Sequence, residues 1–198
     1  NFVQGRPNDR IGIVVYAAES YTKTPVTSDK GIVQDAILSI KYDNVLQDGT
    51  GIGMGLTTAI NRLKDSKAKS KVIILLTDGV NNAGFIEPET ASQIAKEYGI
   101  KVYTIGIGTN GMAEFPYAYA PNGNGFLFKM MPVEIDEQLM KTIAKNTGGK
   151  YFRASSNSKL EEIYNEINKL ETTEIEELKF YDYDEKYRPF VWIAGILV

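Results

Sequence analysis

Asp78 is the residue of this chain that is best placed to do chemistry. It follows the run from Val72 to Thr77, whose composition predicts a central strand buried on both faces, and it precedes Gly79. In parallel α/β sheets, ligands bind beyond the carboxyl ends of the strands, where the Asp78 carboxylate would stand. An Asp-Gly pair is also a common turn, but the position at the end of a central strand favours a functional carboxylate.

A second oxygen-bearing side chain, Thr50, lies where a helix is expected to begin. It follows Asp48 and Gly49 and precedes an apolar helical face. Taken alone, a threonine at a helix N-terminus is best explained as a cap, because its hydroxyl can accept a hydrogen bond from a free backbone N–H group. Residue type and position therefore predict a capping role for Thr50.

The composition removes most kinds of active site. The 198 residues include no Cys and no His, which excludes disulfides, thiol nucleophiles, imidazole bases and the usual zinc, copper or haem ligands. Any metal must be a hard cation held by oxygen atoms, and the common catalytic triads cannot be assembled. The 25 acidic and 22 basic residues give a net charge of −3, which predicts no nucleic-acid binding.

Two glycine-rich stretches imitate nucleotide-binding motifs. Gly106, Gly108 and Gly111 match G-x-G-x-x-G, but residues 112–116 do not open the helix that a dinucleotide site requires. The alternating glycines within 49–55 have the wrong spacing for a phosphate loop, and close packing of a helix against a neighbour explains them better. Neither stretch predicts a bound nucleotide.

Strands and helices alternate along most of the chain. Strands are expected at 11–17, 25–27, 72–77, 100–106 and 151–154, with helices following residues 29, 50, 87, 136 and 158. This alternation, with uniformly apolar strands, predicts an α/β fold: a Rossmann-like, doubly wound, mostly parallel sheet flanked by helices.

Capping residues and helical spacing predict where the helices begin and which faces they bury. Asp29 and Asp136 are expected to cap two helices, and Ser158 with Glu161 forms a capping box for the last one. The apolar residues recur every three or four positions, so they are expected to face the sheet. The expected inward residues are Ile32, Val33, Ala36, Ile37, Ile40, Ile52, Leu56, Ala59, Ile60, Leu63, Ala91, Ile94, Ala95, Tyr98, Leu139, Met140, Ile143, Ala144, Leu160, Ile163, Tyr164, Ile167 and Leu170.

Three segments fall outside this alternation. Residues 107–134 are rich in Gly, Pro and aromatics, which predicts an excursion such as a hairpin whose aromatics form a contact surface, or else a small satellite core. Residues 171–188 are charged and are expected to form a stalk. The apolar run at 189–198 is too short to cross a bilayer but resembles the start of a transmembrane helix, with a buried terminal strand as the alternative.

Five segments, taken in order, resemble von Willebrand factor type A domains. They are 9–17 (DRIGIVVYA), 48–56 (DGTGIGMGL), 72–79 (VIILLTDG), 102–109 (VYTIGIGT) and 147–152 (TGGKYF). The resemblance covers residues 1–170 and is greatest to the bacterial aerotolerance (Bat) group, whose members carry such a domain between transmembrane helices. The run MPVEID at 131–136 and the apolar C-terminus support that narrower resemblance.

The resemblance implies a metal-ion-dependent adhesion site that holds Mg²⁺ or a similar divalent cation. The family pattern combines D-x-S-x-S on the first strand, a Thr before a later helix and an Asp after the fourth strand. By alignment, Thr50 and Asp78 are the expected Thr and Asp ligands. In the family, one coordination position stays open for an acidic group of a protein partner, so the resemblance implies a binding module with no catalytic residues.

The sequence departs from the family pattern at its start. It contains no D-x-S-x-S, and the resemblance begins at the end of the family's first helix, so the first central strand and most of the first helix are expected to be missing. The sheet should then have a gap between the strands at 11–17 and 72–77. Direct pairing, another segment or another chain, through homo-oligomerisation or strand exchange, would close it. With half of the ligands, the chain should bind a metal weakly or not at all.

The Bat resemblance also implies a location and a role. It implies a bacterial inner-membrane protein with its domain on the periplasmic side, anchored by flanking helices and acting in a complex linked to stress tolerance. Two alternatives remain: a carboxylate-based Rossmann-like hydrolase with its site near Asp78 and residues 107–134 as a lid, and a structural module that binds no metal.

Overall fold

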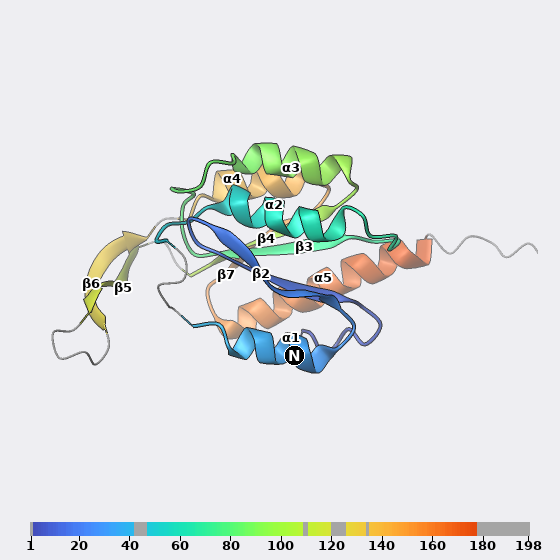
Figure 1. The fold of residues 1–198 in the computed structure, drawn as a ribbon, viewed down its shortest axis with the longest axis horizontal. Helices are drawn as coiled ribbons and strands as arrows, with labels where there is room; N and C mark the ends of the chain where they lie inside the picture. The colour runs from blue at the N-terminus through green and yellow to red at the C-terminus, as the bar shows by residue number, and fades with distance from the viewer. Residues whose placement is uncertain (1, 42–46, 109–110, 120–125, 134, 178–198) are drawn as a thin grey trace, which may run out of the picture.

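The structure is a computed structural model that describes residues 2–41, 47–108, 111–119, 126–133 and 135–177. Its helices cover both faces of a central layer of strands (Figure 1). One face carries α2 (Ile52–Leu63), α3 (Pro88–Glu97) and α4 (Glu137–Asn146), and the other carries α1 (Lys30–Leu38) and α5 (Asn157–Glu177). This layering confirms the predicted α/β fold.

The strands form two separate groups within the central layer. β3 (Val72–Thr77), β4 (Lys101–Ile107) and β7 (Tyr151–Ala154) form a parallel sheet in the order β3-β4-β7. β1 (Ile11–Tyr16) and β2 (Ser20–Thr27) form an antiparallel pair. β2 is longer than predicted because its residues pair with β1 along nearly the whole length of both strands.

A gap separates the two groups of strands, as the sequence predicted. β1 and β3 are not hydrogen-bonded to each other as neighbouring strands. Instead, the Tyr16 hydroxyl, at the end of β1, donates a hydrogen bond of 2.7 Å to the backbone oxygen of Leu76 in β3. The flanking strands therefore do not close the gap by direct pairing, and no strand among the described residues fills it.

The larger hydrophobic core lies between the sheet and the helices α2, α3 and α4. Ile52, Leu56 and Ile60 of α2 are almost completely buried, and Met140 and Ile143 of α4 pack into the same cluster. Full burial of one such side chain stabilises a fold by roughly 1.5–3 kcal/mol. These residues are the ones that helical spacing predicted.

A second core lies between the sheet and α5, with one correction to the predicted helix face. Ile163 and Ile167 are buried against aromatic and aliphatic side chains of β4 and β7. Leu170, which was expected to point inward, is 38% exposed, whereas Glu171 is 3% exposed. Because Glu171 follows Ile167 by four positions, it continues the buried stripe, and hydrogen bonds from Ser70 and Tyr103 make this burial tolerable.

The predicted inner face of α1 is largely exposed. Val33 is fully buried, but Ile32, Ile37 and Ile40 are 53%, 42% and 45% exposed. The expected burial of these three residues is wrong, because in the described structure α1 packs only against β1 and β2. Tyr98 is also exposed, since α3 has ended before its side chain could face the sheet.

The predicted helix caps at Asp29 and Asp136 are confirmed. Asp29 accepts a hydrogen bond from the Ile32 N–H, and Asp136 accepts one from the Leu139 N–H. The capping box that begins at Ser158 is wrong. α5 begins at Asn157, and the hydroxyl of Ser156, one position earlier, accepts a hydrogen bond of 3.2 Å from the Lys159 N–H.

The excursion at 107–134 is a hairpin, as predicted. β5 (Gly111–Tyr119) and β6 (Phe126–Val133) pair antiparallel and project from one end of the molecule (Figure 1). No other described element packs extensively against either strand. The turn signals at 122–125 lie outside the described residues, and the aromatic contact surface stays a prediction.

The C-terminal segments are described only in part. α5 continues to Glu177, so the first residues of the predicted stalk at 171–188 are helical. The apolar run at 189–198 lies outside the described residues. Within the part of the chain that the structure describes, no helix has both the length and the apolar character needed to cross a membrane.

Candidate functional site

Thr50 and Asp78 lie together at the carboxyl edge of β3. The strand leads directly into Asp78, which is exposed, and the turn before α2 brings Thr50 to the same edge. A Cβ atom placed on Gly79 would lie 3.2 Å from the Thr50 hydroxyl oxygen. The structure therefore brings together the two side chains that the sequence singled out, with the Thr50 hydroxyl beside the Asp78-Gly79 turn.

Thr50 does not cap α2. The N-cap position is Gly51, and no side chain of the capping residue contributes a hydrogen bond. Asparagines of the loop after β3 act in its place: Asn81 accepts from the Ile52 N–H at 2.9 Å, and Asn82 accepts from the Thr50 N–H at 2.8 Å. The capping interpretation of Thr50 is therefore wrong, because the Asn81 amide oxygen, and not the Thr50 hydroxyl, accepts from a free N–H group of the helix start.

Backbone hydrogen bonds fix the position of Thr50. Its carbonyl oxygen accepts from the N–H groups of Asn82 and Ala83, at 3.0 and 3.3 Å, and the adjacent Gly51 N–H donates to the Ala17 oxygen at 2.6 Å. The turn before α2 is thus held between the segments that follow β1 and β3. A side chain on such a braced turn is better positioned to bind a ligand than one on a free loop.

The glycines within 49–55 allow this close packing, as predicted. Gly49 has a φ of +135°, and a Cβ atom there would lie 2.6 Å from the Ala83 Cβ. A Cβ atom on Gly53 would lie 1.9 Å from the Ile86 backbone oxygen. Glycine is required at both positions, because Ala83 and Ile86, in the segment between β3 and α3, occupy the space that a side chain would need.

Tyr16 is a largely buried, uncharged side chain close to Asp78. Burial raises the pKa of Tyr16 to about 12; a hydrogen bond with Thr77 opposes this rise, and the negative charge of Asp78 adds to it. The phenol therefore stays protonated and donates to Leu76 at neutral pH. Asp78 itself forms no ion pair with any described residue, so its charge is available to a cation.

The donors at this edge fit a hard divalent cation in kind but not in number. A hydroxyl and a carboxylate supply oxygen ligands, which Mg²⁺ and Ca²⁺ prefer, but such ions take six or more ligands. The described residues contain no cluster of three or more acidic, His or Cys side chains that could hold a metal. Thr50 and Asp78 therefore offer two oxygen donors of the right kind, which are fewer than such a cation takes.

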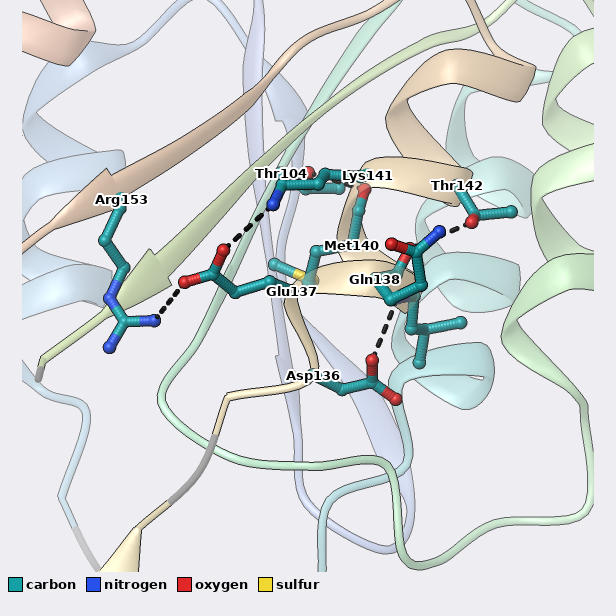
Figure 2. Close-up of polar contacts among 9 residues, drawn as sticks. Thr104, Asp136, Glu137, Gln138, Met140, Lys141, Thr142 and Arg153 are labelled. Carbon is teal, nitrogen blue, oxygen red and sulfur yellow. Dashed lines mark hydrogen bonds and ion pairs between the residues drawn. The ribbon is translucent and has the colours of Figure 1, made fainter. Parts of the chain in front are cut away.

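Arg153 organises a second polar cluster at the base of the hairpin. From β7 it donates to the Gly108 oxygen at 2.9 Å. It also donates to the Glu137 carboxylate at 3.0 Å (Figure 2). Gly108 precedes the hairpin and Glu137 follows it, so one guanidinium contacts both ends. The hydrogen bond from Lys141 is the main reason that the pKa of Glu137 is lowered, and the charges of Lys141 and Arg153 add to it.

The glycine motif at 106–111 does not bind a dinucleotide in the manner of the motif it imitates. After Gly108 the chain continues into β5, which begins at Gly111, where the fingerprint requires a helix. The expectation that residues 112–116 do not open a helix is confirmed.

The sequence reasoning missed four residues that shape this edge: Tyr16, Asn81, Asn82 and Arg153. A pair of asparagines directly after a strand-ending Asp-Gly was a usable signal, because amide oxygens commonly accept from nearby backbone groups. Arg153 gave a weaker signal, a charged residue inside a short apolar strand. Nothing in the sequence indicated that the Tyr16 hydroxyl would reach β3.

Comparison with known sequences supports the resemblance. The von Willebrand factor type A domain profile matches residues 1–166. An uncharacterized protein of Borreliella burgdorferi is 27% identical over 197 residues, which cover 100% of this chain and 57% of that protein. The chain thus spans little more than half the length of this curated relative.

Solved structures of similar fold include two proteins from Bacteroides species. BatB from Bacteroides thetaiotaomicron has a TM-score of 0.73 and 28% identity, covering 86% of this chain and 83% of its own. An aerotolerance-related membrane protein from Bacteroides fragilis has a TM-score of 0.71 and 27% identity, covering 85% and 81%.

A more distant structure holds a metal. Proximal thread matrix protein 1 from the mussel byssus, described with a zinc-occupied MIDAS motif, has a TM-score of 0.60 and 25% identity, covering 85% of this chain and 37% of its own. The fold, the order of the motifs and the profile match agree. The chain belongs to the von Willebrand factor type A domain family.

Proposed function

We propose that this chain is the greater part of a non-enzymatic, metal-dependent protein-binding module. The observation that carries the proposal is the position of the Thr50 hydroxyl beside the Asp78-Gly79 turn, 3.2 Å from the place of a Gly79 Cβ. Two oxygen donors from different elements meet at the edge of the sheet where ligands of α/β proteins bind. The MIDAS motif of the mussel protein supports a divalent cation as the ligand in this family.

The gap between β1 and β3 indicates where the missing donors would come from. A strand in that gap would end at the same edge as β3, next to Asp78, and the D-x-S-x-S that this sequence lacks would lie on it. The greater length of the relatives is in line with an upstream segment that supplies this strand. Strand exchange with a second copy would serve the same purpose.

The residues of this chain would bind and orient the partner's acidic group. A divalent cation held by Thr50, Asp78 and the upstream donors would offer an open coordination position to a carboxylate of a protein partner. Asn82 fixes the backbone of Thr50, and the neutral Tyr16 adds no competing charge below Asp78. Recognition would depend on charge and geometry, and the partner would leave chemically unchanged.

The names of the similar structures support a place in the bacterial envelope. One is an aerotolerance-related membrane protein and another is BatB. We propose that the module is anchored in the inner membrane through the apolar run at 189–198, that it faces the periplasm, and that it acts in a complex linked to stress tolerance.

Calorimetric titration of Mg²⁺ and Mn²⁺ tests the metal site. The titrations use this chain and the longer gene product with its upstream residues, each beside its Asp78→Ala variant. Asp65→Ala is the matched control, since Asp65 lies in the loop before β3, at the opposite end of that strand. We expect binding by the longer protein that disappears in Asp78→Ala and persists in Asp65→Ala. Absence of binding by the longer protein would refute the metal site and leave the metal-free structural module.

A further inference from the structure

The end of the domain opposite Thr50 and Asp78 carries a cluster of basic side chains. The last turn of α2, the loop from α2 to β3 and the last turn of α3 contribute to it. We define the basic end as the side chains of Arg62, Lys64, Lys67, Lys69, Lys71 and Lys96. Within residues 62–71, the five cations are accompanied by a single acid, Asp65.

The cations of the basic end form no ion pair with any described residue. Elsewhere on the same domain, Lys141, Lys150 and Lys159 each pair with a glutamate. Attraction to the partial negative charge at a helix C-terminus accounts for Arg62 and Lys96, which lie in last turns. It does not account for Lys67 and Lys69, which are exposed in the loop beyond α2.

The basic end lies beside the part of α5 from which the chain leaves the domain. Lys71 donates to the Tyr98 oxygen, and its own oxygen accepts from the Lys101 N–H, so the loops before β3 and β4 are adjacent. Ser70 donates to Glu171 at 2.9 Å, which joins the first loop to α5. In Figure 1 the C-terminal part of α5 lies at the end of the molecule opposite the hairpin.

We propose that the basic end binds the anionic headgroups of the membrane in which the chain is anchored. The inference rests on the membrane anchoring proposed above and is independent of the metal site. Only eleven residues separate Glu177 from the start of the apolar run at Pro189, and they can span about 40 Å at most. Such a tether keeps the basic end close to the lipid surface, where clustered lysines are attracted to anionic lipids.

This contact would also orient the candidate metal site. Lys71 precedes β3 and Asp78 follows it, so a strand of six residues, about 20 Å long, separates them. With the basic end on the membrane, Thr50 and Asp78 would face away from the lipid, toward a partner in solution.

Sedimentation with lipid vesicles tests the proposal. The chain is mixed with vesicles of phosphatidylcholine alone and with vesicles that also contain phosphatidylglycerol. The test variant replaces Lys64, Lys67, Lys69 and Lys71 by Gln, and the matched control replaces Lys141, Lys145, Lys150 and Lys159 by Gln, which changes the net charge equally. A double variant of the exposed Lys67 and Lys69 serves if the fourfold variant does not fold.

We expect the test variant to bind phosphatidylglycerol vesicles at least tenfold more weakly than the unchanged chain, because each lysine near an anionic surface adds attraction. Added salt should weaken the unchanged chain in the same way. Binding to phosphatidylcholine, which reports the apolar run alone, should be equal for all three proteins. The control should retain its binding to phosphatidylglycerol vesicles.

Two results would overturn the proposal. One is a test variant that binds phosphatidylglycerol vesicles as tightly as the unchanged chain or more tightly. The other is equal binding of the unchanged chain to both kinds of vesicle. Failure of the anchoring itself would appear separately, as no binding to phosphatidylcholine, and the titrations with Mg²⁺ would be unaffected by either result.

Discussion

Replacing Glu171 by Gln should destabilise the domain far more than the same change at another glutamate of α5. Glu171 is 3% exposed, and its carboxylate accepts hydrogen bonds from the Tyr103 hydroxyl at 2.6 Å and from Ser70 at 2.9 Å. It also pairs with the Lys101 ammonium at 3.1 Å. Removing one partner of a buried pair costs about 3–5 kcal/mol because the other charge loses its compensation.

The expected magnitude for Glu171→Gln is somewhat smaller. The Lys101 side chain is 17% exposed, so water can replace part of the lost interaction, and glutamine keeps one acceptor for Tyr103. We expect a loss of about 2–4 kcal/mol in the free energy of unfolding, which corresponds to a fall of roughly 5–15 °C in Tm for a domain of this size. Urea unfolding followed by circular dichroism measures the loss.

Glu166→Gln is the matched control. Glu166 also pairs with a lysine, Lys150, but the two side chains are 46% and 57% exposed. Exposed pairs contribute about 1 kcal/mol or less because water and salt screen them. Equal losses for Glu171→Gln and Glu166→Gln would refute the reasoning that burial makes the Glu171 pair costly to break.

The pH dependence gives a second check of the same prediction. Burial acts to raise the pKa of Glu171, but the hydrogen bonds from Tyr103, Lys101 and Ser70 and the charge of Lys101 outweigh it and lower the pKa. A lowered folded-state pKa stabilises the fold above the unfolded-state pKa of about 4.3, and this stabilisation is lost as the pH falls through the folded-state pKa. The difference between the unchanged chain and Glu171→Gln should therefore be constant near neutral pH and shrink in acid. A difference that stays constant through acid pH would contradict the assignment to the ionised carboxylate.

Two further predictions concern backbone packing and the hairpin. Gly53→Ala should lower the free energy of unfolding in urea by about 3 kcal/mol, because the new Cβ would lie 1.9 Å from the Ile86 backbone oxygen. The control is Gly31→Ala on α1, where the new Cβ meets only the Asp29 side chain at 3.2 Å, and it should be neutral or slightly stabilising. If Gly53→Ala is equally well tolerated, α2 and the loop before α3 can move apart. Arg153→Gln should speed amide hydrogen exchange in the hairpin about tenfold while β3 stays protected, because the hydrogen bonds from Arg153 to both ends of the hairpin are lost. Unchanged exchange in the hairpin would mean that other contacts hold its ends.

Local sequence patterns were sufficient to predict most of the fold. The uniformly apolar run that became β3 could be buried on both faces only inside a sheet covered by helices. The stripes of α2 and α4 matched their cores because each helix has a neighbouring layer to pack against. The position of Asp78 at the edge of the sheet could be predicted for a related reason, because the end of a buried strand and the residue type that follows it are both visible in the sequence.

The errors came from interactions between distant segments. Thr50, considered alone, was interpreted as a cap because Asn81, which accepts from the first N–H of α2, lies 29 residues further along the chain. Leu170 was expected inside because helical spacing ranks residues by hydropathy, and only the meeting of Ser70, Tyr103 and Lys101 makes Glu171 the better buried residue. Neither set of partners can be identified from spacing within one helix.

The exposed face of α1 and the gap beside β3 have a common explanation. An amphipathic pattern states which side chains need burial, but it does not provide the element that buries them. Ile32 and Ile37 follow a helical stripe, yet in the described structure the stripe has no element packed on its outer part. The backbone oxygen of Leu76 likewise faces the gap, and it accepts a hydrogen bond from the Tyr16 hydroxyl where a neighbouring strand would otherwise donate one. An upstream strand and helix would cover both places at once. A longer gene product should therefore bind the metal more tightly and unfold at a higher temperature than this chain. Thermal unfolding of the two proteins in the presence of a chelator measures the effect of packing without the metal, and equal Tm values there would show that the upstream residues do not pack into this fold.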